Sequence, residues 1–166
     1  MFAGSFDPYE IYVWNVKTAN ILQIISGHGP VSCIEIGGER LISGSWDRTL
    51  KIHEIYSRKL NVDTLDHSSQ ITALAMHPNR KQIAVATLKG EIYIWELENA
   101  QLLGIINSEL EGGRSYFSKV SSSNDTNSRY LKALAYSSCG NYLIGGGKSK
   151  YLMIYDVKHR MVFKKM

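Results

Sequence analysis

Residues 40–55, RLISGSWDRTLKIHEI, decide the fold that this sequence predicts. Two runs of alternating side chains, 41–46 and 49–55, flank a turn that contains Asp47, which is the pattern of a β-hairpin. A Gly-His pair, with the imidazole of His28, stands shortly before the first run. The stretch therefore raises two questions: which fold contains this hairpin, and whether Asp47 and His28 serve chemistry or structure.

The second strand of this hairpin recurs along the chain at an interval of about 40 residues. Each copy alternates its side chains and then ends with an aromatic residue or His, a polar or acidic residue and an aliphatic one. The last interval is longer because it contains an insertion. The four copies are IYVWNV (11–16), LKIHEI (50–55), IYIWEL (92–97) and LMIYDV (152–157).

Other short apolar runs, bounded by turn residues such as Gly, Asn, Asp and Ser, precede and follow each copy. Each unit thus contains four strands, and no long segment shows the i, i+3, i+4, i+7 spacing of a helix. Four-stranded units at this period predict an all-β fold, a partial β-propeller of about three and a half antiparallel blades. We expect a single domain, 1–166, with blade segments 1–26, 27–66, 67–107 and 131–166 and an insertion at 108–130.

Together with the upstream Gly-His, the run SGSWDRTLKI (43–52) resembles the WD40 repeat. This resemblance implies that His28, Ser43 and Asp47 form a hydrogen-bonded chain that stabilises the blade. His53 would join it at a position where the family usually has Trp. The third unit keeps a histidine but has Lys in place of the Asp, and the fourth has Ser there, so we expect those blades to rely on packing. The residues concerned are His67, Lys89 and Ser149.

Ser43, His28 and Asp47 are also the residue types of a catalytic triad. Two observations favour the structural interpretation: no GxSxG elbow exposes the serine, and a blade provides no evident oxyanion hole. The run GGGKSK (145–150) lacks the first glycine of a Walker A motif and precedes a strand-like segment rather than a helix. The five histidines form no cluster with the spacing of a zinc site. We therefore expect no catalytic residue, no cofactor and no metal.

Composition narrows the class of protein further. The net charge of +4 arises from residues 148–166, and no apolar run approaches the roughly 20 residues of a membrane-spanning helix. The N-terminus does not resemble a signal peptide. Cys33 and Cys139 flank no CxxC pattern, so we expect both thiols to be reduced. A cytosolic or nuclear protein is the default expectation.

The insertion at 108–130 and the number of units raise two further points. The insertion is rich in Ser and Asn, which leaves open both a solvated loop and a partner-binding arm anchored by Tyr116 and Phe117. Propellers close into a ring, which leaves no long exposed strand edge. Since this chain holds too few units to close, we expect it to be part of a larger propeller.

Successive strands of a blade run in opposite directions. The turn between the second and third strands therefore emerges on the same side of the blade as the loop that leads to the next blade. We therefore predict a moderately basic face that binds a partner through the turns and the insertion, with solvated surface charges as the alternative. The proposed contact residues are Arg48, Lys89, Arg114, Tyr116, Phe117, Lys119, Arg129 and Lys148.

The whole chain, in order and with the insertion in place, is similar to one family of eukaryotic WD40 proteins, the periodic tryptophan proteins. The segments that carry this resemblance include LISGSWDRTLKI (41–52), EGGR (111–114) and GGGKSKYLMIYDV (145–157). The match is to the latter part of the second of two tandem propellers.

The family resemblance implies a nucleolar, non-catalytic scaffold in the small-subunit processome, a small nucleolar ribonucleoprotein that acts in ribosomal RNA processing and small-subunit biogenesis. The implied partners are other protein subunits of the processome, together with pre-ribosomal RNA or small nucleolar RNA. No membrane and no small-molecule substrate is implied. The alternative is a WD40 adaptor in another complex, such as a ubiquitin-ligase substrate receptor or a trafficking protein.

Overall fold

The computed structural model describes residues 1–26, 28–55, 62–107, 110–111, 114–115, 130–148 and 150–166. Within these residues every regular element is a strand. The described residues therefore contain no helix that could cross a membrane. The predicted all-β class is confirmed.

Four antiparallel sheets contain nearly all of the strands. The first is formed by β1 (Phe2–Gly4), β2 (Glu10–Trp14) and β3 (Ile21–Ser26). The second is formed by β4 (Val31–Gly37), β5 (Arg40–Ser45), β6 (Thr49–Glu54) and β7 (Val62–Asp66). The third is formed by β8 (Ile71–Met76), β9 (Gln82–Thr87), β10 (Glu91–Glu96) and β11 (Gln101–Asn107). The fourth is formed by β14 (Leu131–Tyr136), β15 (Tyr142–Gly147), β16 (Met153–Asp156) and β17 (Met161–Lys165).

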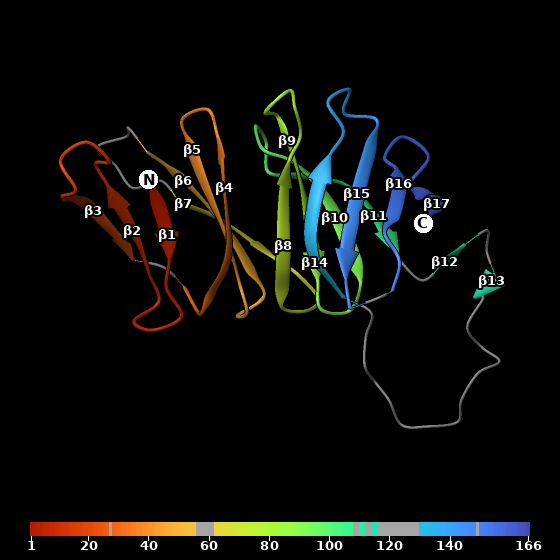
Figure 1. The fold of residues 1–166 in the computed structure, drawn as a ribbon, viewed down its shortest axis with the longest axis horizontal. Helices are drawn as coiled ribbons and strands as arrows, with labels where there is room; N and C mark the ends of the chain where they lie inside the picture. Colours follow the sequence, from red (N-terminus) through yellow and green to blue (C-terminus); the bar gives the residue numbers. More distant parts are fainter. Residues whose placement is uncertain (27, 56–61, 108–109, 112–113, 116–129, 149) are drawn as a thin grey trace.

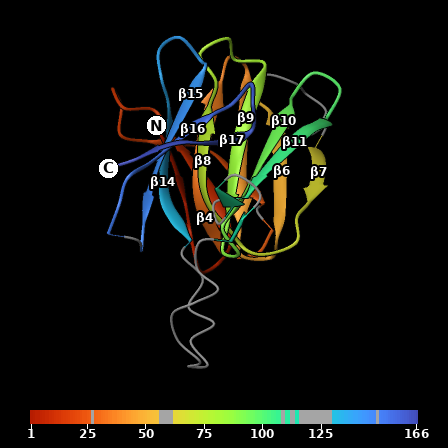
Figure 2. The ribbon, with the colours of Figure 1, turned by 90° about the vertical axis from the view of Figure 1, so that its right-hand side faces the viewer.

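Each of these sheets, here called the first to fourth blades, pairs its strands in chain order, as short connections between antiparallel neighbours require. A separate two-stranded pair, β12 (Leu110–Glu111) and β13 (Arg114–Ser115), lies within the predicted insertion. The blades stand side by side in chain order (Figure 1), and a quarter turn puts the fourth blade nearest the viewer (Figure 2). Three four-stranded blades and one three-stranded blade confirm the predicted partial propeller.

Apolar side chains fill the spaces between neighbouring blades. One cluster joins the third and fourth blades and combines small and branched residues, among them Ala84, Ile92 and Leu143. A second joins the second and third blades through residues such as Leu50 and Val85. A third cluster joins the first two blades. Because each strand alternates its side chains, every inner blade contributes one face to each of two neighbouring clusters.

The outward faces of the first and fourth blades carry exposed apolar side chains. Ile144 in β15 is opposite Ile154 and is 38% exposed, whereas Ala84, at the matching register opposite Ile94 in the third blade, has no exposed surface. In the first blade Ile24 is 51% exposed. In the two inner blades these positions are covered by a neighbouring blade. In the first and fourth blades the equivalent positions are open to solvent.

Candidate functional site

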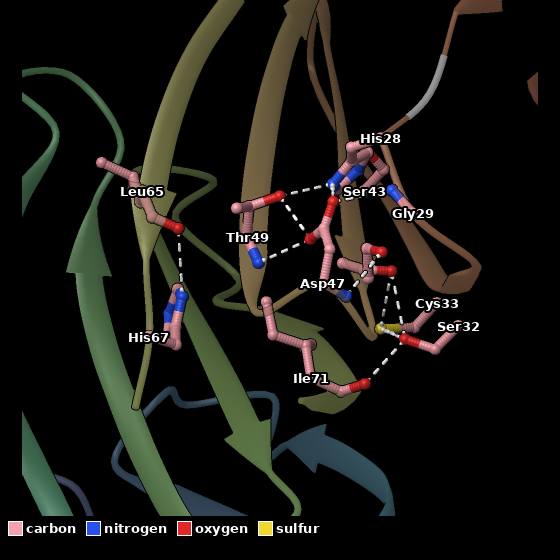
Figure 3. A network of polar contacts seen from close by, with 12 residues as sticks. His28, Gly29, Ser32, Cys33, Ser43, Asp47, Thr49, Leu65, His67 and Ile71 are labelled. Atoms are coloured by element: carbon pink, nitrogen blue, oxygen red, sulfur yellow. Dashed lines mark hydrogen bonds and ion pairs between the residues drawn. The ribbon is translucent and has the colours of Figure 1, made fainter. Parts of the chain in front are cut away.

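A network of polar side chains crosses the second blade (Figure 3). His28 lies in the loop before β4, Ser43 lies on β5, Asp47 lies in the β5–β6 turn, and His53 lies near the end of β6. The structure brings all four of these residues into one chain of contacts, and it adds Thr49, the first residue of β6.

Asp47 fixes the turn between β5 and β6. One carboxylate oxygen, Oδ2, accepts a hydrogen bond from the Gly29 amide at 2.6 Å. The other oxygen, Oδ1, accepts bonds from the amide of Thr49 at 2.8 Å and from its hydroxyl at 2.6 Å. Such a bond from the amide two residues onward is the usual mode in which Asp stabilises a turn. The carboxylate thus links the loop before β4 to the beginning of β6.

Thr49 stands between the aspartate and the imidazole. The Nδ1 atom of His28 lies 2.6 Å from the Thr49 hydroxyl oxygen but 3.4 Å from Oδ2 of Asp47. Our prediction had Asp47 fix the imidazole directly, so the threonine is a member of the network that sequence reasoning missed. Its signal was present in the sequence, because Thr two residues after a turn Asp is well placed to bond that carboxylate.

One assignment of protons satisfies every contact in the chain. His53 Nε2–H donates to the Ser43 hydroxyl at 3.2 Å, and that hydroxyl donates to Nε2 of His28 at 2.9 Å. Nδ1–H of His28 then donates to Thr49, whose hydroxyl donates to Asp47. Nδ1 of His53 is buried and has no hydrogen-bond partner among the residues that the structure describes. Both histidines are accordingly neutral in this arrangement.

Burial sets the protonation of these groups. It lowers the pKa of His28, and it lowers the pKa of His53 to about 4, with help from the charge of Lys51 and from repulsion by His28 when that ring is protonated. Partial burial acts to raise the pKa of Asp47, but the bonds from Thr49 and Gly29 outweigh it and hold that pKa below its ordinary value. The network is thus built for a charged aspartate and two neutral imidazoles.

The same geometry bears on the triad hypothesis. Ser43, His28 and Asp47 are in triad order, but Ser43 has no exposed surface and the His28 side chain is only 3% exposed. The serine hydroxyl is also already shared between two imidazoles. A nucleophile must reach a substrate carbonyl. This serine has no path to one, so the arrangement supports a structural role.

The third blade keeps only part of this network. Nε1–H of Trp95 donates to Nε2 of His67 at 3.0 Å, and Nδ1–H of His67 donates to the Leu65 carbonyl at 3.1 Å. Val85, opposite Tyr93, occupies the register position that Ser43 holds opposite Lys51. Lys89 is exposed in the β9–β10 turn. Ser149 of the fourth blade lies outside the described residues.

The predicted partner-binding residues divide into three groups. Arg48 and Lys89 are exposed in the β5–β6 and β9–β10 turns, and Lys148 is exposed just after β15. Arg114 lies in β13. The remaining four lie outside the described residues: Tyr116, Phe117, Lys119 and Arg129.

An aromatic pair that the sequence analysis did not single out lies on the same side as these turns. Phe6, in the β1–β2 turn, and Trp46, in the β5–β6 turn, meet edge to face with ring centroids 5.0 Å apart. The sequences GSFD (4–7) and GSWD (44–47) place the two rings at equivalent positions of neighbouring blades. This internal match was the signal that could have identified the pair.

Comparison with known proteins agrees with the geometry. The family model described as WD domain, G-beta repeat, matches residues 19–54 and 60–96. The chain is 36% identical, over 98% of its length, to periodic tryptophan protein 2 of Saccharomyces cerevisiae, and 33% identical, over the same share, to the homolog of that protein in Mus musculus. It covers 18% of each of these relatives, so the chain spans about a fifth of their length. An F-box/WD-40 repeat-containing protein of Arabidopsis thaliana is 28% identical over 80% of the chain.

Proposed function

This chain is a WD40-repeat protein similar along nearly all of its length to periodic tryptophan protein 2, and on that premise we propose that it is a non-catalytic scaffold in the small-subunit processome. The proposed role is to hold other protein subunits, and pre-ribosomal or small nucleolar RNA, during the processing of ribosomal RNA precursors. The proposed location is the nucleolus.

The observation that carries this proposal is the extent of the similarity. The F-box/WD-40 protein matches at 28% identity over 80% of the chain, whereas the relatives named periodic tryptophan protein 2, or its homolog, match at 32–36% identity over 98–99% of it. Relatives with the same name occur in fungi, in mouse and in Arabidopsis, as expected for a process common to eukaryotes.

The described geometry supports the non-catalytic part of the proposal. Of the residues that most resemble a catalytic group, Ser43 and the side chain of His28 are buried, and they are bonded to each other. Exposed charged residues instead lie in turns on one side of the blades, where they can contact a macromolecule. Arg48, Lys89 and Lys148 are the turn residues that we assign to such contacts.

Affinity purification of the tagged full-length protein tests the proposal. We expect it to recover small nucleolar RNA and precursor ribosomal RNA in a large particle, and we expect its depletion to cause unprocessed small-subunit precursor to accumulate. Recovery of ubiquitin-ligase subunits without these RNAs, together with normal ribosomal RNA processing after depletion, would support the adaptor alternative.

The assigned contacts are tested by changing Arg48, Lys89 and Lys148 together to Ala in the full-length protein. Contacts between cations and acidic groups of a partner weaken with salt, so we expect the variant to leave the particle at lower salt than the wild type. The wild-type melting temperature should be retained, because all three residues are exposed. Unchanged co-purification across a salt series would show that these residues are not the contact.

A further inference from the structure

Phe6 and Trp46 form an exposed aromatic corner between the first two blades. Each side chain is 52% exposed although the two rings contact each other at an interplanar angle of 89°. The turns that carry them emerge at the same edge of the molecule, the lower edge in Figure 1. Two large rings at a right angle leave a corner open to solvent, where a third apolar group can contact both.

The backbone holds both turns in place. In the first turn the Ser5 hydroxyl donates to the Asp7 carbonyl at 2.7 Å, and the Ser5 carbonyl accepts a bond from the Val31 amide of the second blade at 3.2 Å. In the second turn the Trp46 amide donates to the Pro30 carbonyl at 3.1 Å, next to the Asp47 bonds described above. The polar network of the second blade thus also fixes the base of Trp46.

Rigid exposed aromatic residues are efficient binding anchors. A ring that is already fixed loses little conformational entropy on binding and buries a large apolar area. Trp is enriched among the residues that dominate binding energy at protein interfaces. The pair therefore has the properties of an anchor site rather than of an isolated apolar side chain on a surface.

The charges around the corner favour a protein ligand over nucleic acid. The two turns carry Asp7 and Asp47 against Arg48, a net charge of −1, which disfavours a phosphate backbone. Asp47 is already saturated by donors, whereas Asp7 is exposed next to Phe6 and its carboxylate takes no hydrogen bond from any described residue. Asp7 is thus available to accept a cation, and the electron-rich faces of the rings attract a cation as well.

We propose that Phe6, Trp46 and Asp7 form a docking site for an extended protein segment that presents a proline or another apolar side chain next to a lysine or arginine. The apolar side chain enters the aromatic corner, and the cation pairs with Asp7. Aromatic-lined recognition of proline-containing segments uses the same physics, because such a segment is already extended before it binds. The site does not depend on which particle the protein joins.

The test selects ligands for the full-length protein from a random twelve-residue peptide library and measures the selected peptides by fluorescence anisotropy. We expect enrichment of peptides with an apolar residue or proline beside Lys or Arg. Trp46→Ala should weaken their affinity about thirtyfold, as truncation of an anchor residue does. Trp46→Phe should weaken it less, and Asp7→Asn should reduce its salt dependence. Leu102→Ala is the control, since Leu102 is a 39% exposed apolar residue of β11 in the third blade, which has a neighbouring blade on each side.

Circular dichroism checks that each variant folds. If Trp46→Ala does not fold, the variants Trp46→Phe and Asp7→Asn still test the proposal. The proposal is overturned if no such peptides are enriched, or if the Trp46 and Asp7 variants bind them as the wild type does. It is also overturned if the variants lose affinity for a twelve-nucleotide uridine oligomer instead. Failure of the processome proposal would appear in the RNA recovered with the tagged protein and would leave this peptide result unchanged.

Discussion

The second and third blades have the same four-stranded meander but are stabilised differently. In the second blade a chain of polar contacts runs from His53 through Ser43, His28 and Thr49 to Asp47. At the corresponding place in the third blade, Trp95 donates to His67, and the Ser68 hydroxyl donates to the carboxylate of Glu91 at the beginning of β10. Its strand β9 is instead apolar through Ile83, Ala84, Val85 and Ala86, all without exposed surface.

The comparison shows that the strand pattern and the polar network are separable. Ser43 and Val85 hold the same register position, yet both blades keep their full ladders. A buried hydroxyl must be hydrogen-bonded, and the network satisfies it, whereas a buried valine needs only close packing. The second blade therefore depends on specific bonds and on protonation, and the third blade depends on volume.

The largest expected effect is a packing effect in the third blade. Ile92 is fully buried in the cluster between the third and fourth blades, so Ile92→Ala should lower the free energy of unfolding by about 2–5 kcal/mol. Ile36, which is 46% exposed, is the control, and Ile36→Ala should cost far less. Urea denaturation gives both values. A cost for Ile92→Ala below that for Asp47→Ala would contradict the view that packing dominates this blade.

The second expected effect is loss of stability in acid. Folding lowers the pKa of His53 from 6.5 to about 4, so the unfolded chain binds more protons between these values, and stability falls as pH falls through that window. A shift of that size corresponds to roughly 3 kcal/mol once pH is below the folded pKa. Asp47 has a lowered pKa, so its contribution is lost only at more acidic pH, below its ordinary value.

The variant His53→Phe isolates the contribution of His53 to the pH dependence of stability, because phenylalanine does not titrate. Its unfolding free energy should depend less steeply on pH between 6.5 and 4 than that of the wild type. His28 and His67 also have lowered pKa values and remain in the variant, so some dependence should persist. Only the slope is compared, because the substitution also changes packing. Equal slopes would mean that His53 is not the acid-sensitive group.

A third, smaller effect should separate the two turns. Asp47→Ala leaves the Gly29 amide and the amide and hydroxyl of Thr49 without their acceptor, which should cost on the order of 1–3 kcal/mol. Lys89→Ala, at the equivalent turn of the third blade, should change stability by less than about 0.5 kcal/mol. Thermal unfolding of the two variants decides the matter. Similar losses for both would remove the distinction between the blades.

The fold could be predicted because its signals are local. Alternation along a strand and turn residues between strands specify a blade by themselves, and the WD40 resemblance then identified His28, Ser43, Asp47 and His53. Contacts between residues distant in sequence were less accessible. The match between GSFD (4–7) and GSWD (44–47) places Phe6 and Trp46 at equivalent positions, but the contact between their rings depends on how neighbouring blades pack. The predicted loss of the network in the third blade also left out the bond from Trp95 to His67.

The smallest expected effect comes from giving the third blade the aspartate that it lacks. Both ring nitrogens of His67 are already used, Nδ1 as donor to the Leu65 carbonyl and Nε2 as acceptor from Trp95. A carboxylate at position 89 would therefore find no imidazole proton, and Val85 cannot extend the chain as Ser43 does. We expect Lys89→Asp to change the free energy of unfolding by less than about 0.5 kcal/mol, as exposed substitutions usually do. A gain of about 1 kcal/mol or more, the usual worth of one hydrogen bond, would show that the new carboxylate finds donors in the turn, as Asp47 does at Gly29 and Thr49. In that case the turn aspartate alone would be enough to stabilise the turn, and this difference between the two blades would lie in one residue rather than in how each blade is packed.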